Sequence, residues 1–156
     1  MRSILVIDHG SVRAEANHML ACVAHLLQQM VGDNVLVRHA HMELAEPSIA
    51  DGFATCVRDG ATDVVAFPYM LSPGKHSTRD IPRLVKEAAA PFPNVTYRVT
   101  EAFGVSAQLA EVVALRAGVE IAHPITTEES CQCWEPAGRV GECGAACAAR
   151  IAESVA

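Results

Sequence analysis

Apolar and polar positions form alternating blocks of strand length and helix length over the first 117 residues. Four apolar runs of strand length cover residues 3–7, 35–41, 63–67 and 95–100. Stretches with helical periodicity lie after them, at residues 12–31, 47–60, 80–90 and 106–117. Such alternation of strands and helices predicts an α/β fold, in which a four-stranded parallel sheet has helices on both faces.

The spacing of apolar side chains predicts which face of each helix is buried. In the first helix the expected core face consists of Met19, Val23, Leu26 and Met30. In the second helix the side chains expected to face inward are Ile49, Phe53, Cys56 and Val57. Pro47 is expected to open that helix and Gly60 to end it. Asp80 is the expected N-cap of the third helix, which must end before Pro91.

A second stripe along the first helix carries polar side chains and a thiol. Its members are His18, Cys22, His25 and Gln29. These types could bind a metal ion, but spacing of three and four residues is weak evidence for a ligand set. A polar face beside the core stripe is the favoured interpretation.

Composition limits the classes of protein that fit this chain. With 156 residues, 51% of them hydrophobic, the chain suits one well-filled core and a tail. Only 4% are aromatic, which indicates an aliphatic core of the kind found in covered parallel sheets. The net charge of −6 gives no general attraction for nucleic acid or an anionic membrane. We see neither a signal peptide nor a membrane-spanning segment, and expect a cytoplasmic protein.

Helical and strand periodicity stop near residue 118, so we expect a domain over residues 1–118 and a linker with a cysteine-rich tail over 119–156. The tail holds four of the six cysteines, namely Cys131, Cys133, Cys143 and Cys147. In a reducing compartment such a cluster favours a metal site over disulfides. The spacing departs from the paired C-x-x-C of common zinc sites, so a [2Fe–2S] cluster, zinc and a disulfide pair all stay open.

Polar and charged side chains follow three of the predicted strands. They are Asp8, His9, Ser11 and Arg13 after the first, His41 and Glu43 after the second, and Lys75, His76, Arg79 and Asp80 after the third. Because ligands of open α/β sheets bind beyond the carboxyl ends of the strands, this edge is the expected site. Two imidazoles and a carboxylate suit divalent iron, cobalt, nickel or zinc. The alternative is that both His9 and His76 serve the loop backbone alone.

Three sequence motifs at this edge resemble those of the small sirohydrochlorin chelatases. They are residues 6–13 (VIDHGSVR), 41–49 (HMELAEPSI) and 71–76 (LSPGKH), the last followed by Asp80-Ile81-Pro82. The resemblance covers about residues 3–117 in order and with similar spacing. It implies the chelatase fold, with His9 and His76 binding the incoming metal ion. It assigns Glu43 to metal handling or proton removal.

The resemblance also implies an activity, a substrate and an assembly. The expected enzyme is a sirohydrochlorin ferrochelatase, which inserts Fe²⁺ into sirohydrochlorin to give siroheme. Short members of the family pair as homodimers, and plant members carry a [2Fe–2S] cluster on C-terminal cysteines, which favours a cluster here. The substrate carries many carboxylates, so Ser11, Arg13, Lys75 and Arg79 are the expected substrate contacts.

Three alternatives compete with iron insertion. The first is insertion of cobalt or nickel into the same tetrapyrrole, since imidazole suits all three metals. The second is a carrier that holds a metal ion or a tetrapyrrole without turnover. The third, a flavodoxin-like receiver domain, expects an acidic phosphoacceptor after the third strand, where this chain has Phe67-Pro68-Tyr69.

Overall fold

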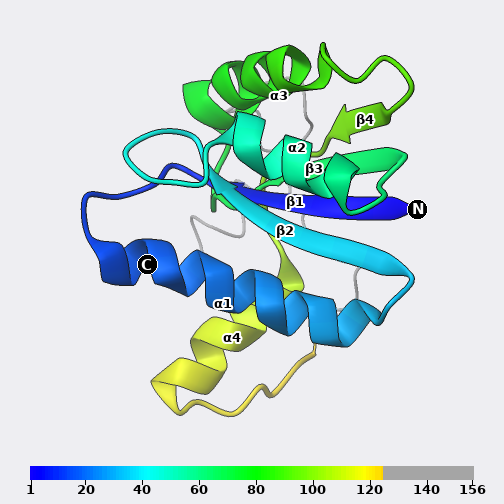
Figure 1. Cartoon of the computed structure of the whole chain (residues 1–156). Coiled ribbons are helices and arrows are strands. Elements are labelled where there is room, and N and C mark those ends of the chain that lie inside the picture. The colour runs from blue at the N-terminus through cyan, green and yellow to red at the C-terminus, as the bar shows by residue number, and fades with distance from the viewer. Residues whose placement is uncertain (125–156) are drawn as a thin grey trace, which may run out of the picture. The chain divides into compact units, whose positions relative to one another are not determined.

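Four parallel strands form one sheet in the order β2-β1-β3-β4 in the computed structural model, which describes residues 1–124 (Figure 1). The strands are β1 (Arg2–Asp8), β2 (Val35–His41), β3 (Asp63–Pro68) and β4 (Thr96–Val99). The predicted fold class and parallel sheet are therefore confirmed. The chain divides into two compact units, Met1–Ala102 and Phe103–Ala156, and the whole sheet belongs to the first.

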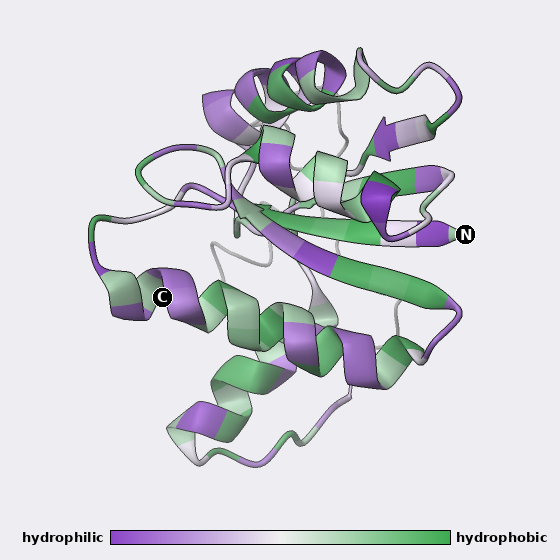
Figure 2. Cartoon of the chain, in the orientation of Figure 1, coloured by the Kyte–Doolittle hydropathy of each residue, from purple (hydrophilic) through white to green (hydrophobic). Residues whose placement is uncertain are grey.

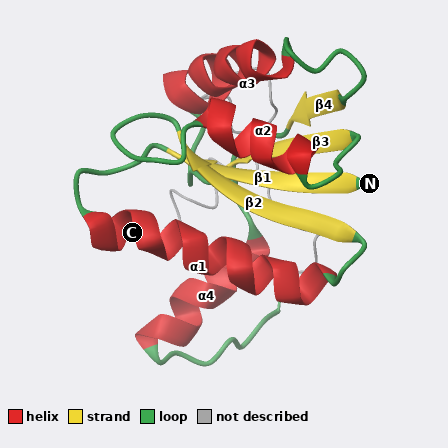
Figure 3. Ribbon diagram, in the orientation of Figure 1, coloured by secondary structure: helices red, strands yellow, loops and turns green. Residues whose placement is uncertain are grey.

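Helices cover both faces of the sheet within the first unit. One face packs against α1 (Ala14–Val31), and the other packs against α2 (Ile49–Arg58) and α3 (Ile81–Ala89) (Figure 3). A short π-helical turn, η1 (His76–Asp80), runs directly into α3. The loops at the carboxyl ends of the strands connect the sheet to these helices.

The larger core lies between the sheet and the α2–α3 layer. Figure 2 shows the apolar character of the middle of β1 and the first half of β2. The side chains expected to face inward from α2 do so: Ile49, Phe53 and Cys56 are buried, and Val57 packs against them. A Cβ on Gly52 would lie 2.9 Å from atoms of both Ala40 and Leu5, so the helix approaches the strands closely at this point.

The prediction of which face of α1 is buried is wrong. Met19, Leu26 and Met30 are 60%, 58% and 75% exposed. The buried stripe lies one residue further along, at Leu20 and Ala24, and continues with the partly buried Leu27 and Val31. The helix carries two apolar stripes about 100° apart, and packing on Val6 and Val37 of the sheet selects the second.

The expected starts of two helices also need correction. Ser48, rather than Pro47, precedes α2 as its N-cap, and its side chain accepts a hydrogen bond from Asp51 N. Asp80 has helical backbone angles and makes no capping bond, because the helical segment already begins at His76. Its carboxylate instead accepts a hydrogen bond from the ring of His76.

Residues 103–124 of the second unit contain the helix α4 (Ala107–Ala117). Ser106 caps its start by accepting from Leu109 N, and Gly118, with φ of +68°, ends it.

Among the helices of residues 1–124, none has both the length and the apolar character to cross a bilayer. The expected tail ligands, Cys131, Cys133, Cys143 and Cys147, lie outside the described residues.

Candidate metal centre

His9, Glu43 and His76 come together from three different crossovers at the carboxyl edge of the sheet. His9 lies on the loop between β1 and α1, Glu43 on the loop between β2 and α2, and His76 at the start of η1. His9 Nε2 is 2.7 Å from Glu43 Oε1. The rings of His9 and His76 have centroids 5.1 Å apart, with an angle of 74° between their planes. Two imidazoles and a carboxylate thus share one small region.

Extension of the strand pairing into the loops places Glu43 beside His9. Beyond the last paired strand residues, Met42 N donates to Asp8 O at 2.9 Å and Glu43 N donates to His9 O at 3.1 Å. The chain then turns at Gly10, whose φ is +82° and whose added Cβ would lie 1.9 Å from Glu43 O. Glycine therefore allows both the turn and the close approach of the two loops.

Hydrogen bonds engage Nδ1 of both rings, while Nε2 of His9 is paired with Glu43. His9 Nδ1 lies 3.2 Å from the carbonyl oxygen of Gly10, and His76 Nδ1 lies 3.1 Å from Asp80 Oδ2. A carbonyl accepts and cannot donate, so Nδ1 of His9 carries a proton, and an ionised Asp80 imposes the same tautomer on His76. Nε2 is therefore the nitrogen that each ring could offer to a metal ion, with a hydrogen-bond acceptor beside Nδ1.

The three side chains are accessible and form an open site. The side chains of His9, Glu43 and His76 are 42%, 53% and 47% exposed. Glu43 occupies Nε2 of His9 through their ion pair. Over residues 1–124, no three His, Cys, Asp or Glu side chains are already arranged to hold an ion. An ion at this edge would therefore displace Glu43 from His9, which suits short-lived binding more than a closed structural site.

The four expected substrate contacts lie in the same loops. Arg13 and Lys75 are exposed, and the Arg79 side chain is 70% exposed, with Nε 3.8 Å from Asp80 Oδ1. Ser11 Oγ accepts from Arg13 N at 3.1 Å, so this hydroxyl also supports the turn into α1. Arg13 and Lys75 are thus exposed at this edge, Arg79 is exposed but paired with Asp80, and Ser11 is partly committed to the backbone.

Sequence reasoning missed Asn17 as a support of the loop that carries His9. Asn17 Oδ1 accepts from Ser11 N at 2.9 Å, and Asn17 Nδ2 donates to Ser11 O at 2.8 Å. This double hydrogen bond ties the loop to the first turn of α1. Nothing in the apolar pattern signals it, whereas the i, i+4 spacing of His76 and Asp80 could have revealed that pair.

The stripe of His18, Cys22, His25 and Gln29 lies on the exposed side of α1. Cys22 Sγ is 3.5 Å from His18 Nε2, and Gln29 Nε2 is 3.2 Å from His25 Nε2. These contacts join neighbours on successive turns of one helix. They agree with the favoured interpretation of a polar face.

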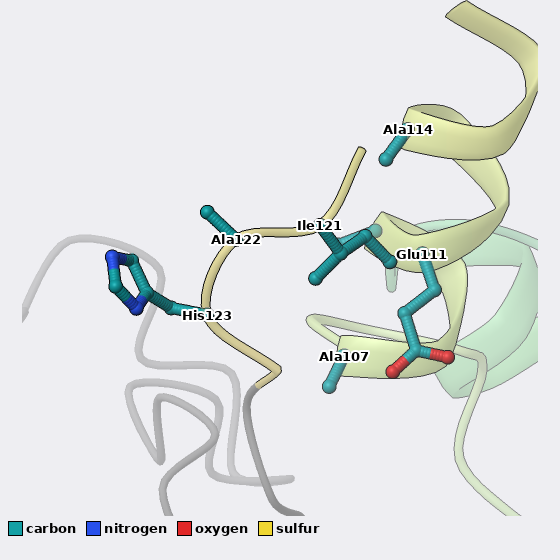
Figure 4. A pocket seen from close by; sticks show the side chains of 7 residues that line it. Ala107, Glu111, Ala114, Ile121, Ala122 and His123 are labelled. Carbon is teal, nitrogen blue, oxygen red and sulfur yellow. The ribbon is translucent and has the colours of Figure 1, made fainter. Parts of the chain in front are cut away.

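Neither of two pockets is lined by His9, Glu43 or His76. A groove of about 490 Å³ between α2 and α3 is lined by Asp51 and Glu87 among mostly apolar residues. A pocket of about 360 Å³ in the second unit lies between α4 and residues 121–123, and Figure 4 shows Ile121 beside the helix while His123 points away. Both have an acidic lining residue and neither has a lysine or arginine, so neither suits a ligand rich in carboxylates.

His39 gives the folded protein a dependence on pH. Burial lowers the pKa of His39 below its ordinary value of 6.5, and the nearby His41 adds to the shift while Asp8 opposes it. The unfolded chain then binds a proton more readily than the folded one. The free energy of unfolding is therefore not reduced by His39 above pH 6.5. It falls as the pH decreases from 6.5 towards the lower pKa of His39 in the folded chain. The variant His39→Gln should lose part of this acid destabilisation, as measured by denaturant unfolding at several pH values.

The control for this prediction is His18→Gln, which replaces an exposed histidine. It should unfold with the same pH dependence as the unmodified chain. An unchanged pH dependence in His39→Gln would contradict the prediction.

The fold and the donors at its edge define the class of protein. The sirohydrochlorin chelatase SirB from Bacillus subtilis subspecies spizizenii, solved in complex with cobalt, has the same fold. The two chains superimpose with a TM-score of 0.69 and 28% identity over 75% of this chain and 50% of that one. The protein is thus a chelatase-like α/β protein. More particularly, it belongs to the CbiX family, whose model matches residues 3–119.

Two proteins with similar sequences are metal chelatases. The chain is 44% identical over 110 residues to the chloroplastic sirohydrochlorin ferrochelatase of Arabidopsis thaliana, covering 70% of this chain and 48% of that one. It is 33% identical over 119 residues to a sirohydrochlorin cobaltochelatase of Priestia megaterium, covering 74% and 37%. The chain thus spans about half the length of these relatives, or less. Because the plant relative is chloroplastic, the cytoplasmic location stays a prediction.

Proposed function

We propose that this chain is a sirohydrochlorin ferrochelatase, a lyase of siroheme biosynthesis that inserts Fe²⁺ into sirohydrochlorin. The observation that carries the proposal is the convergence of His9, Glu43 and His76, with His9 Nε2 only 2.7 Å from the carboxylate. The choice of iron rests on the 44% identity to the plant ferrochelatase.

The reaction requires a metal ligand and a proton acceptor on one face of the macrocycle. As M²⁺ binds the four ring nitrogens, two N–H bonds break and two protons leave, with no change of oxidation state. His9 and His76 hold the ion through Nε2 until the ring nitrogens replace them. Before Nε2 of His9 can bind the ion, the proton between Nε2 and Glu43 leaves to solvent. Glu43, then ionised and unpaired, can take one pyrrole proton, and a histidine released by the ion can take the other.

The basic side chains of the same loops would hold the substrate. Sirohydrochlorin carries many carboxylates, whereas the chain has a net charge of −6, so a local positive region is needed. Arg13, Lys75 and Arg79 are exposed at this edge and can provide it, together with the hydroxyl of Ser11. These contacts orient the ring over the two imidazoles.

An anaerobic insertion assay with sirohydrochlorin tests this function. We expect many turnovers per enzyme with Fe²⁺, followed by the change in visible absorption of the macrocycle. Stoichiometric binding of sirohydrochlorin or metal without multiple turnover would contradict the proposal and identify a carrier. If the protein binds neither sirohydrochlorin nor the metal ion, both the proposed site and the proposed activity are wrong.

Insertion of Co²⁺ is the second candidate. A cobaltochelatase relative is 33% identical, and the structure of the Bacillus relative contains cobalt. Imidazole and carboxylate ligands bind Fe²⁺, Co²⁺ and Ni²⁺ alike. The order of affinity for the three ions is similar at most such sites, so the residue types do not identify the metal that is inserted. Equal amounts of the three ions in one assay would rank their insertion rates, and a faster rate with cobalt would favour the second candidate.

We further propose a homodimer and a [2Fe–2S] cluster on Cys131, Cys133, Cys143 and Cys147. Short members of the family pair as homodimers, and this chain matches only 50% of the Bacillus relative, which supports the dimer. Light scattering at the mass of one chain would contradict the dimer. A brown protein with sulfide-to-iron charge-transfer absorption would support the cluster. A colourless protein with bound zinc would contradict the cluster.

A further inference from the structure

A half-buried carboxylate, Asp8, and a buried imidazole, His41, lie next to the proposed metal centre. His41 is 1% exposed, and its Nδ1 is 2.6 Å from Asp8 Oδ1. The main chain of His41 is held as well, because its N–H donates to Pro47 O at 2.8 Å. The position of His41 is therefore set by both its backbone and its ring.

Asp8 connects this pair to the loop that carries His9. Its Oδ1 accepts a second hydrogen bond, from Gly10 N at 2.9 Å. The carbonyl of the same Gly10 lies 3.2 Å from His9 Nδ1, and its N–H and carbonyl thus join Asp8 to the His9 ring. The chain of contacts runs from the buried His41 through Asp8 and Gly10 to the metal-binding ring.

We propose that His41, acting through Asp8, is a positioning residue that holds the His9 ring in the orientation needed to bind metal. The inference deepens the proposed function and rests on it. Because the His41 side chain is buried, it cannot contact the macrocycle itself. Its bond to Asp8 keeps one carboxylate oxygen aimed at Gly10 N, which restricts the backbone turn on which His9 depends.

The structure offers a matched control for this role. His39 is on the same strand, and its ring centroid is 5.8 Å from that of His41, at 69° between planes. It is half-buried, and no hydrogen bond links it to Asp8 among those found over the described residues. A change at His39 therefore perturbs the same end of β2 without removing the bond to Asp8.

The test compares His41→Leu, His41→Asn and His39→Leu in the full chain. His41→Leu removes the donor, whereas the amide of His41→Asn can donate from nearly the position of Nδ1. We expect His41→Leu to raise the KM for Fe²⁺ or Co²⁺ by about 10-fold, the lower end of the effect of direct outer-shell partners, because His41 acts through Asp8 and Gly10. The KM for sirohydrochlorin should stay unchanged. His41→Asn should restore most of the metal affinity, and His39→Leu should behave as the unmodified chain.

Metal binding without turnover separates this inference from the proposed function. Calorimetric titration with Co²⁺ is carried out on the unmodified chain and on His9→Ala, and the binding lost in His9→Ala defines the signal of this site. If no signal is lost, the proposed metal centre fails. If the signal exists and His41→Leu retains it at full affinity, the positioning role alone is overturned.

A second variant covers the case in which His41→Leu does not fold. Asp8→Asn keeps an acceptor for Gly10 N but exchanges a charge-assisted bond to His41 for a neutral one, which is weaker. It should also weaken Co²⁺ binding at the His9-dependent site, with a smaller effect. Unchanged binding in Asp8→Asn, or an equal rise in both KM values with His41→Leu, would contradict the inference.

Discussion

Replacing either His9 or His76 by alanine is expected to lower the rate of metal insertion by on the order of 100-fold or more, since even outer-shell partners of metal ligands cost about 10- to 100-fold. The two rings lie with centroids 5.1 Å apart and offer the two imidazole ligands of the proposed centre. Losing one leaves a single imidazole beside Glu43. Initial rates of anaerobic insertion, measured at saturating sirohydrochlorin and varied Fe²⁺, provide the comparison.

His18→Ala serves as the control, because it removes an exposed histidine of α1 whose ring contacts Cys22. It should leave the insertion rate unchanged. Thermal unfolding of all three variants shows whether a lost rate reflects a lost ligand or a lost fold. A rate within a few-fold of the unmodified chain for both His9→Ala and His76→Ala would refute metal delivery by these histidines.

Gly10→Ala is expected to lower the free energy of unfolding by about 2–4 kcal/mol, combining strain at positive φ with displacement of packed backbone. The new Cβ would lie 1.9 Å from Glu43 O, so the loops that carry His9 and Glu43 must move apart. Insertion activity should fall too, because the geometry between His9 and Glu43 depends on this contact. Denaturant unfolding and the insertion assay measure the two effects.

Gly32→Ala provides a matched control for this substitution. Gly32 also has a positive φ, +70°, but an added Cβ there meets nothing within 4 Å. It should therefore show the backbone strain alone, about 1–3 kcal/mol, with unchanged activity. Equal destabilisation by the two substitutions would show that the close approach of the loops contributes nothing.

Much of the fold could be predicted because its signals are local. The alternation of strand-length and helix-length blocks reflects periods of two and 3.6 residues, which short stretches of chain encode. The inward side chains of α2 were predicted correctly, since Ile49, Phe53 and Cys56 form a single clear stripe. In α1 two stripes compete, and the choice depends on the sheet surface that the helix covers.

The candidate site divides in the same manner. The motifs around His9, Glu43 and His76 are readable along the chain, and topology predicts that their loops share one edge. The partners that orient the rings are less readable. Asp80 was expected to cap a helix and instead accepts from His76, because the helical segment begins one turn earlier.

The sequence by itself determined the order of strands and helices, the aliphatic core and the residue types gathered at one edge, because each depends on local periodicity or composition. Only the tertiary structure decided which stripe of α1 is buried, that Glu43 lies against His9, and that Asp8 joins His41 to Gly10. These features arise from the register of β1 against β2 and from contacts between loops more than thirty residues apart. No local pattern records such contacts, since they exist only once the strands have paired.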